Sequence, residues 1–225
     1  MRYLNGEATE IRKESIQSCK GTIEFFSLVI CSEPLDHAEE MPITFPRLHT
    51  LRLNEWSIYA SIFLRRFSFP ALRTLHIGWM IGHLRHFDLP IPEDLSPFPS
   101  FPHLRELQWE GTSPDKLVAL QILLASTPNL QILSDQDVLG SEGEGGALIG
   151  ALVAVAHQMV CPMLREVHVR RASASELDLL TADIGRSALK IISVHSLRGD
   201  AGIDTEAALK RVRERGVELQ IRGGN

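Results

Sequence analysis

One phrase recurs along this 225-residue chain and limits the possible folds more than any other feature. An aromatic residue, Thr or Cys is followed by Pro, one residue, Leu, two residues, an apolar residue, one residue and often a second apolar residue. The copies are FPRLHTLRL (45–53), FPALRTLHI (69–77), FPHLRELQW (101–109), TPNLQILSD (127–135), CPMLREVHV (161–169) and, without the proline, SALKIISV (187–194). A phrase that returns at nearly regular intervals is typical of a repeat protein.

The first leucine of each copy sets the length of the repeat. Successive separations are 24, 32, 26, 34 and 25 residues, for Leu48, Leu72, Leu104, Leu130, Leu164 and Leu189. Three of them lie within the range of about 20 to 29 residues that is typical of leucine-rich repeats. The two longer separations contain insertions, a Pro-rich segment at 89–102 and a Gly-rich segment at 140–146.

Alternating apolar residues within each copy predict a short strand with one buried face. The proline favours a helix end before the strand, because it disfavours helix at the residue that precedes it. The same spacing places Ile23, Phe26 and Leu28 in an earlier strand, and 217–221 in a last one. Helical patterns separate the copies, at 57–67, 114–126, 146–159, 175–185 and 204–216.

Strand and helix that alternate at this period predict parallel strands joined by right-handed crossovers. A single repeat cannot bury its own apolar face, so the repeats must stack. We therefore predict an α/β fold, a leucine-rich-repeat solenoid or horseshoe with a concave parallel sheet and outer helices. Residues 1–20 are expected to form an N-terminal helix, near 8–19, or an incomplete cap. Residues 21–225 are expected to form the repeat domain, with the two insertions.

In its aromatic-Pro-x-Leu-x-x-Leu-x-Leu phrase the chain resembles the repeat region of fungal F-box proteins with leucine-rich repeats. The resemblance covers about residues 21–221. It implies a protein–protein interaction module, with substrate recognition for a ubiquitin ligase as its role and ligase subunits among its partners. The LPxE-like phrase that usually opens the F-box in such proteins is not found in residues 1–20.

Side chains between the buried strand positions are expected to point to the concave face of the sheet. Solenoids use such faces for extended contacts with other proteins. The residues that we expect to contact a partner are Arg52, Asn54, His76, Glu106, Gln108, Glu166, His168 and Arg170. Because acids, bases and amides alternate among them, the partner need not be strongly charged.

The composition argues against several other classes of protein. The net charge is −5 and no basic face is evident, so we expect no nucleic-acid partner. The three cysteines form no CxxC pair, which favours a reducing compartment, the cytoplasm or the nucleus. The first residues are too polar for a signal peptide, and the most apolar stretch, 147–155, is too short to cross a membrane. We therefore expect no membrane partner.

The motifs that resemble catalytic or ligand sites are incomplete. The glycines of 140–146 precede a helix, as in a phosphate-binding loop, but Leu148 occupies the third glycine position of the dinucleotide fingerprint and no GK[ST] follows. His76, His83 and His86 are close in sequence without a nearby cysteine, and no GxSxG phrase occurs. We expect no catalytic residues, no cofactor and no metal, and predict that the protein is not an enzyme.

Two other interpretations of the sequence remain open. The alternation of strands and helices could belong to an α/β nucleotide-binding enzyme domain, which stabilisation by NAD or ATP would reveal. The chain could also be a truncated repeat fragment without function, whose uncapped first strand would expose apolar surface and aggregate.

Overall fold

The structure is a computed structural model, and it shows an α/β fold with a large parallel sheet and helices. It describes residues 3–7, 18, 20–29, 43–54, 64, 67–78, 101–110, 114–135, 147–156, 161–183, 188–199 and 204–222. The chain divides into two compact units, Met1–Gln108 and Trp109–Asn225.

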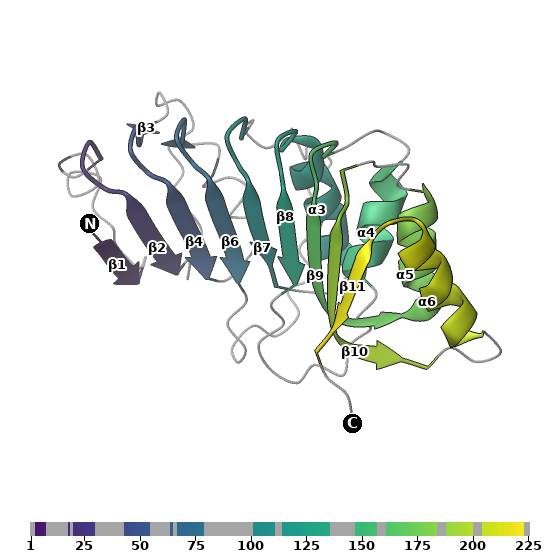
Figure 1. Ribbon diagram of the computed structural model, residues 1–225. Helices are drawn as coiled ribbons and strands as arrows, with labels where there is room; N and C mark the ends of the chain where they lie inside the picture. Colours follow the sequence, from purple (N-terminus) through teal and green to yellow (C-terminus); the bar gives the residue numbers. More distant parts are fainter. Residues whose placement is uncertain are drawn as a thin grey trace. The chain divides into compact units, whose positions relative to one another are not determined.

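The first unit is built on parallel strands that follow one another in the sheet in chain order (Figure 1). They are β1 (Tyr3–Glu7), β2 (Phe25–Val29), β4 (Thr50–Asn54), β6 (Thr74–Gly78) and β7 (Glu106–Trp109), which runs across the boundary between the units. A separate pair of two-residue strands, β3 (Ile43–Thr44) and β5 (Phe67–Ser68), lies beside the turns.

Three elements of this unit differ from the expectation. Strand β1 lies inside the predicted N-terminal cap, and strands β3 and β5 were not predicted at all. The helix predicted over 57–67 is wrong at its end, because Phe67 pairs with Ile43 in a sheet. Of the rest of that helix, and of the one predicted near 8–19, the structure describes only the helical residues Leu64 and Ser18.

The second unit alternates strands and helices as predicted. Its strands are β8 (Ile132–Asp135), β9 (Glu166–Ser173), β10 (Ile191–Arg198) and β11 (Glu218–Ile221), in that order and parallel. Its helices are α3 (Pro114–Ala125), α4 (Ala147–Ala156), α5 (Ala174–Asp183) and α6 (Thr205–Glu214). Successive helices pack on one another, on one side of these strands (Figure 1). The insertion predicted at 140–146, and that at 89–102 except its last two residues, lie outside the described residues.

The recurring phrase forms the same turn wherever it occurs with its proline. In each copy the N–H of the leucine donates to the carbonyl oxygen three residues earlier, at 3.0–3.4 Å, as in Leu72 to Phe69 and Leu164 to Cys161. Proline suits the second position of such a turn, because its fixed φ matches the turn geometry. The proline therefore sets the direction in which each strand leaves the turn.

Strands β4, β6, β7, β9, β10 and β11 begin with a hydrogen bond to the carbonyl oxygen of the equivalent residue before the preceding strand. The His49 oxygen accepts from the N–H groups of Arg73 and Thr74, at 2.9 and 3.0 Å, and the Arg165 oxygen accepts from those of Lys190 and Ile191, at 2.9 and 3.1 Å. Equivalent residues are therefore stacked in register, which keeps every core position opposite its counterpart.

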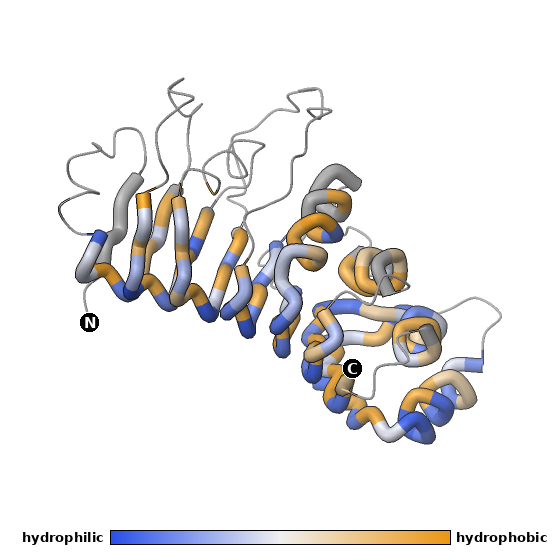
Figure 2. The backbone as a smooth tube through the Cα atoms, turned by 90° about the horizontal axis from the view of Figure 1, so that it is seen from above, coloured by the Kyte–Doolittle hydropathy of each residue, from blue (hydrophilic) through white to orange (hydrophobic). Residues whose placement is uncertain are grey.

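The core positions of the phrase are the buried ones. The leading leucines and the alternating apolar residues after them are buried in the described strands; they include Leu48, Leu51, Leu53, Leu72, Leu75, Ile77, Leu104, Leu107, Trp109, Leu164, Val167 and Val169. The earlier strand predicted from Ile23, Phe26 and Leu28 is confirmed, and its three side chains are buried as well. Figure 2 shows hydrophobic segments returning along the successive strands and on the helices.

Two helices in the second unit start on side-chain caps. At α5, the Ser173 hydroxyl accepts from Glu176 N–H at 3.3 Å while the Glu176 carboxylate accepts from Ser173 N–H at 2.7 Å, a reciprocal capping box. The same carboxylate accepts from Arg198 at 2.7 Å. At α6, Asp204 accepts from Ala207 N–H at 3.0 Å, and Gly216 follows the helix with a φ of 79°. Asp204 therefore caps the start of α6, and glycine accommodates the positive φ just after its end.

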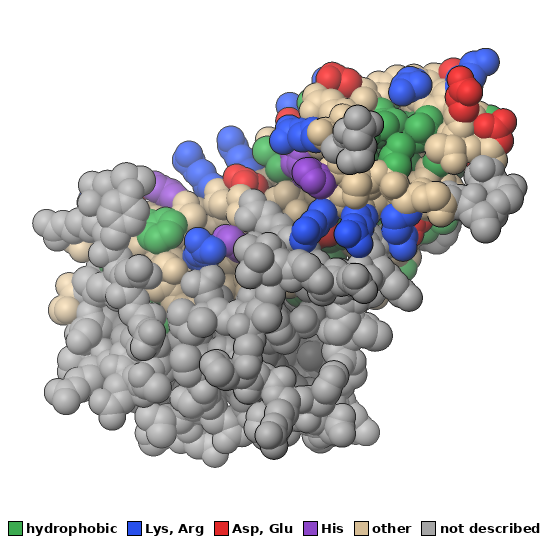
Figure 3. Space-filling model, turned by 90° about the horizontal axis from the view of Figure 1, so that it is seen from below, with side chains coloured by type: hydrophobic (Ala, Val, Ile, Leu, Met, Phe, Trp, Pro, Cys, Tyr) green, Lys and Arg blue, Asp and Glu red, His purple; other side chains and the backbone are tan. Residues whose placement is uncertain are grey.

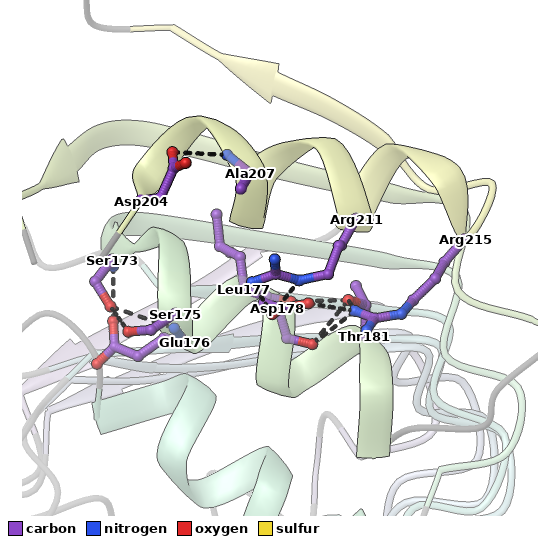
Figure 4. Close-up of polar contacts among 10 residues, drawn as sticks. All are labelled: Ser173, Ser175, Glu176, Leu177, Asp178, Thr181, Asp204, Ala207, Arg211 and Arg215. Carbon is purple, nitrogen blue, oxygen red and sulfur yellow. Dashed lines mark hydrogen bonds and ion pairs between the residues drawn. The ribbon is translucent and has the colours of Figure 1, made fainter. Parts of the chain in front are cut away.

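A single carboxylate joins α5 to α6 (Figure 4). Asp178 accepts from Arg211 Nε at 2.9 Å and from Arg215 Nη1 at 2.6 Å, and Arg215 also donates to Thr181 Oγ1 at 2.7 Å. The hydrogen bond from Arg211 is the main cause that lowers the pKa of Asp178 below its ordinary value of 3.8, with Arg215 adding to it and partial burial opposing it.

Candidate partner-binding face

The side chains opposite the core form rows across the strands of each unit, because parallel strands in register bring equivalent residues side by side. In the first unit, Ser27 pairs with Arg52 and Arg52 with His76. At the start of β7 the Arg73 oxygen accepts from the N–H groups of Arg105 and Glu106, just as the His49 oxygen does at the start of β6. This spacing places Gln108 next to His76 in the row.

Exposure along this row differs from the expectation at one residue. Arg52 is exposed and Gln108 is half-buried, as a contact surface requires. His76 is only 7% exposed, so its ring presents little surface, and its contact with a partner stays a prediction. The backbone of Asn54 belongs to β4, but its side chain lies outside what the structure describes.

In the second unit the corresponding row is Ser134, His168, Ser193 and Gln220, across four neighbouring strands. Both serines are buried, whereas His168 and Gln220 are half-buried. Ser193 Oγ donates to Gln220 Oε1 at 3.1 Å. Small buried serines therefore alternate with larger side chains that reach further from the sheet.

A pair of side chains two residues apart recurs on this face, and the sequence reasoning missed it. Gln108 Nε2 donates to Glu106 Oε1 at 2.7 Å, and Gln220 Nε2 donates to Glu218 Oε1 at 2.8 Å. The third copy is His168, whose Nε2 lies 3.4 Å from Glu166 Oε2. The signal was present in the sequence as ELQ, EVH and ELQ at the same place in three strands.

Two of these glutamates accept a hydrogen bond from the glutamine two residues later. A hydrogen bond of this kind favours one orientation of the amide, which lowers the entropy lost when a partner is bound. The amide oxygen of Gln108 or Gln220 remains able to accept, and the glutamate oxygens have further lone pairs. The arrangement therefore offers oriented acceptors at a regular strand spacing.

Basic side chains follow on the same face toward the ends of the strands. Val194 pairs with Val169 and with Ile221, so the next residues, Arg170, His195 and Arg222, are neighbours in register. Arg170 is half-buried, and the other two are exposed. Figure 3 shows Lys, Arg and His side chains gathered on the side seen from below. The face of the second unit is thus acidic where its strands begin and basic where they end.

The chain was compared with protein-family models, with curated proteins and with solved structures. No family model, no curated protein and no solved structure matches this chain. Among the described residues, no three His, Cys, Asp or Glu side chains gather as ligands of a metal ion. None of the helices in the described ranges is long and apolar enough to cross a bilayer.

Proposed function

We propose that the chain is a leucine-rich-repeat solenoid that binds another protein through the face of its sheet opposite the helices. The observation that supports the proposal is the stacking of equivalent positions. Strands such as β6 and β10 begin with hydrogen bonds to the carbonyl oxygen of the equivalent residue before the preceding strand, His49 and Arg165. Repeats that stack in this way expose a continuous row of side chains, which extended partners can follow.

The paired side chains define what the face recognises. Glu106 and Glu218 accept hydrogen bonds from Gln108 and Gln220, and Glu166 lies 3.4 Å from His168, so part of the side-chain entropy is lost before binding. An extended peptide segment presents backbone N–H groups and polar side chains at a similar spacing to that of the strands. We therefore propose an extended protein segment as the ligand, bound without chemical change. A place in a ubiquitin ligase, which the family resemblance implies, is part of the same proposal.

The proposal is tested by partner capture from native cell extract with mass spectrometry. The test variant carries Arg52→Glu and His168→Glu, which reverse or add charge on the face in each unit. The matched control carries Arg171→Glu and Arg213→Glu, at exposed positions off the face. We expect a partner that binds the wild type and the control but not the test variant, and ligase subunits in the capture would support the ligase role.

Two results would count against this function. The first is a folded bait that captures no specific protein, and the second is an equal loss in the control variant. Stabilisation of the chain against heat by NAD or ATP would then favour the nucleotide-binding alternative.

A further inference from the structure

A second charged surface lies at the edge of the first unit where its strands begin. Each turn places residues on both sides of its leucine at this edge, and five of them are basic and exposed: Arg47, His49, Arg73, His103 and Arg105. We call this set the turn rim. Three of the five are arginines, in a chain whose net charge is −5 with its histidines neutral, so positive charge is concentrated there against the overall balance.

The hydrogen bonds of the backbone hold the rim in a fixed spacing. The His49 oxygen accepts from Arg73 N–H at 2.9 Å, and the Arg73 oxygen accepts from Arg105 N–H at 2.8 Å. Adjacent strands lie about 5 Å apart, so cationic side chains of consecutive turns are close neighbours. Like charges held at this spacing repel one another and favour an anion that can bridge them.

One described carboxylate, Glu24, lies at the equivalent position before β2, where its carbonyl oxygen accepts from His49 N–H at 2.9 Å. No ion pair or side-chain hydrogen bond joins any described carboxylate to the five rim side chains. Arg73, His103 and Arg105, with Pro70 and Ala71, also line an open hollow of about 270 Å³. Two guanidinium groups beside a hollow suit carboxylates, because each can donate two parallel hydrogen bonds to one carboxylate.

We propose that the turn rim binds an acidic polypeptide segment, with a carboxylate side chain in the hollow between Arg73 and Arg105. This is a second interaction surface, beyond the strand face and independent of it.

The surroundings of the rim favour a polypeptide over other polyanions. Single-stranded nucleic acid is usually held by aromatic side chains on which bases stack. The aromatic residues of these turns, Phe45, Phe69 and Phe101, are buried. Binding at a membrane surface needs apolar side chains that enter the bilayer. Among the described residues of this unit, no large hydrophobic side chain is exposed.

The test is fluorescence anisotropy of a labelled synthetic peptide with six consecutive glutamates, titrated with the whole protein. We expect binding with a Kd of about 100 μM or lower at about 50 mM salt, and at least about threefold weaker binding at about 300 mM salt. The variant Arg73→Glu with Arg105→Glu should weaken binding at least about tenfold. Arg73→Gln with Arg105→Gln should show a smaller loss in the same direction.

The matched control is Arg165→Glu with Lys190→Glu, at the same position of the phrase in the second unit. It should bind the peptide like the wild type, and so should the strand-face variant Arg52→Glu with His168→Glu. Circular dichroism of each variant checks that it is folded. Equal binding by wild type and the rim variants, no binding at low salt, or preference for an RNA oligonucleotide or for anionic phospholipid vesicles over the peptide would overturn the proposal.

Discussion

The two units use one turn but fill the position before its proline in different ways. In the first unit the position holds Phe45, Phe69 and Phe101, and in the second it holds Thr127 and Cys161. The Phe45 ring lies 5.8 Å from that of Phe69, centre to centre, and forms part of an apolar stack. Thr127 and Cys161 lie 3.6 Å apart, Oγ1 to Sγ, and form a small polar cluster.

The polar cluster supplies hydrogen-bond donors to the end of a helix, which the aromatic stack does not. Thr127 Oγ1 donates to the Leu124 carbonyl at 3.1 Å, and Cys161 Sγ donates to the same oxygen at 3.3 Å. Leu124 lies in the last turn of α3, where carbonyl groups lack partners within the helix. In a repeat whose helix ends at the turn, a small hydrogen-bond donor at this position therefore stabilises the helix end. The aromatic rings of the first unit stabilise their turns through burial of apolar surface instead.

The largest fall in the free energy of unfolding is expected from Phe45→Ala. Phe45 is fully buried, and its ring centre lies within 6 Å of those of Phe26, Phe67 and Phe69. Loss of the ring leaves a cavity, so the free energy of unfolding should fall by about 3–5 kcal/mol. Hydrogen–deuterium exchange should place the loss in the first unit, with faster exchange in β4 and β6 than in β9 and β10.

The control for this prediction is Phe45→Leu, which keeps most of the apolar volume. It should cost about 1.5 kcal/mol or less. If Phe45→Ala loosened β9 and β10 as much as β4 and β6, the aromatic stack would not be a local feature of the first unit.

A smaller effect is expected from Cys161→Ala in the second unit. The change removes one buried sulfur atom and its hydrogen bond to Leu124, so stability should fall by about 1–2 kcal/mol. Cys161→Ser keeps a donor at this position and separates the hydrogen bond from the lost volume. Chemical denaturation of the three proteins measures the difference. An alanine variant as stable as the wild type would show that the polar cluster does not support α3.

The elements that the sequence predicted correctly are those with a strict local signal. Leu51, Leu75 and Val167 are buried where their phrase required it, because a strand with one buried face forces alternation. The helix predicted over 204–216 is found as α6, whose ends have equally local causes: a side-chain acceptor at Asp204 and a positive φ at Gly216.

The elements that were missed depend on neighbours distant in sequence. Strand β1 forms because the backbone of Tyr3–Glu7 pairs with β2, although YLNGE has little alternation. His76 has the polar character of an exposed residue, yet it is only 7% exposed, which the local sequence pattern does not indicate. For the candidate face, the register could be predicted, and the recurrence of ELQ, EVH and ELQ was visible in the sequence. The contacts within these pairs could not be predicted, since they depend on side-chain rotamers.

A smaller loss of stability than that expected for Cys161→Ala is expected from Ser173→Ala at the start of α5. The hydroxyl accepts from Glu176 N–H, and removal of such a cap typically costs about 1 kcal/mol. Ser175→Ala is the comparison variant, because it removes the 2.9 Å hydrogen bond between the Ser175 and Ser173 hydroxyls but leaves the acceptor of Glu176 N–H in place. Exchange of the first amides of α5, compared with those of β4, measures the effect. Equal losses in the two variants would contradict the capping role of Ser173.

The smallest loss of stability is expected from Asp178→Asn between α5 and α6, and this loss should depend most on pH. Bonds from Arg211 and Arg215 lower the pKa of Asp178 below 3.8, so its stabilisation is fully present above the unfolded value. It is lost as the pH falls through the folded pKa. Since the carboxylate is partly exposed, the loss at neutral pH should be about 1 kcal/mol or less.

Chemical denaturation of wild type and Asp178→Asn across pH 7 to about pH 2 measures this contribution. The difference between the two should be constant at neutral pH and disappear in acid. Glu206→Gln, which removes an exposed carboxylate on α6, is the control and should show a smaller difference. A difference for Asp178→Asn that stays the same in acid would mean that the asparagine disturbs packing between the helices. The charged link would then contribute nothing to the helical layer that distinguishes the second unit.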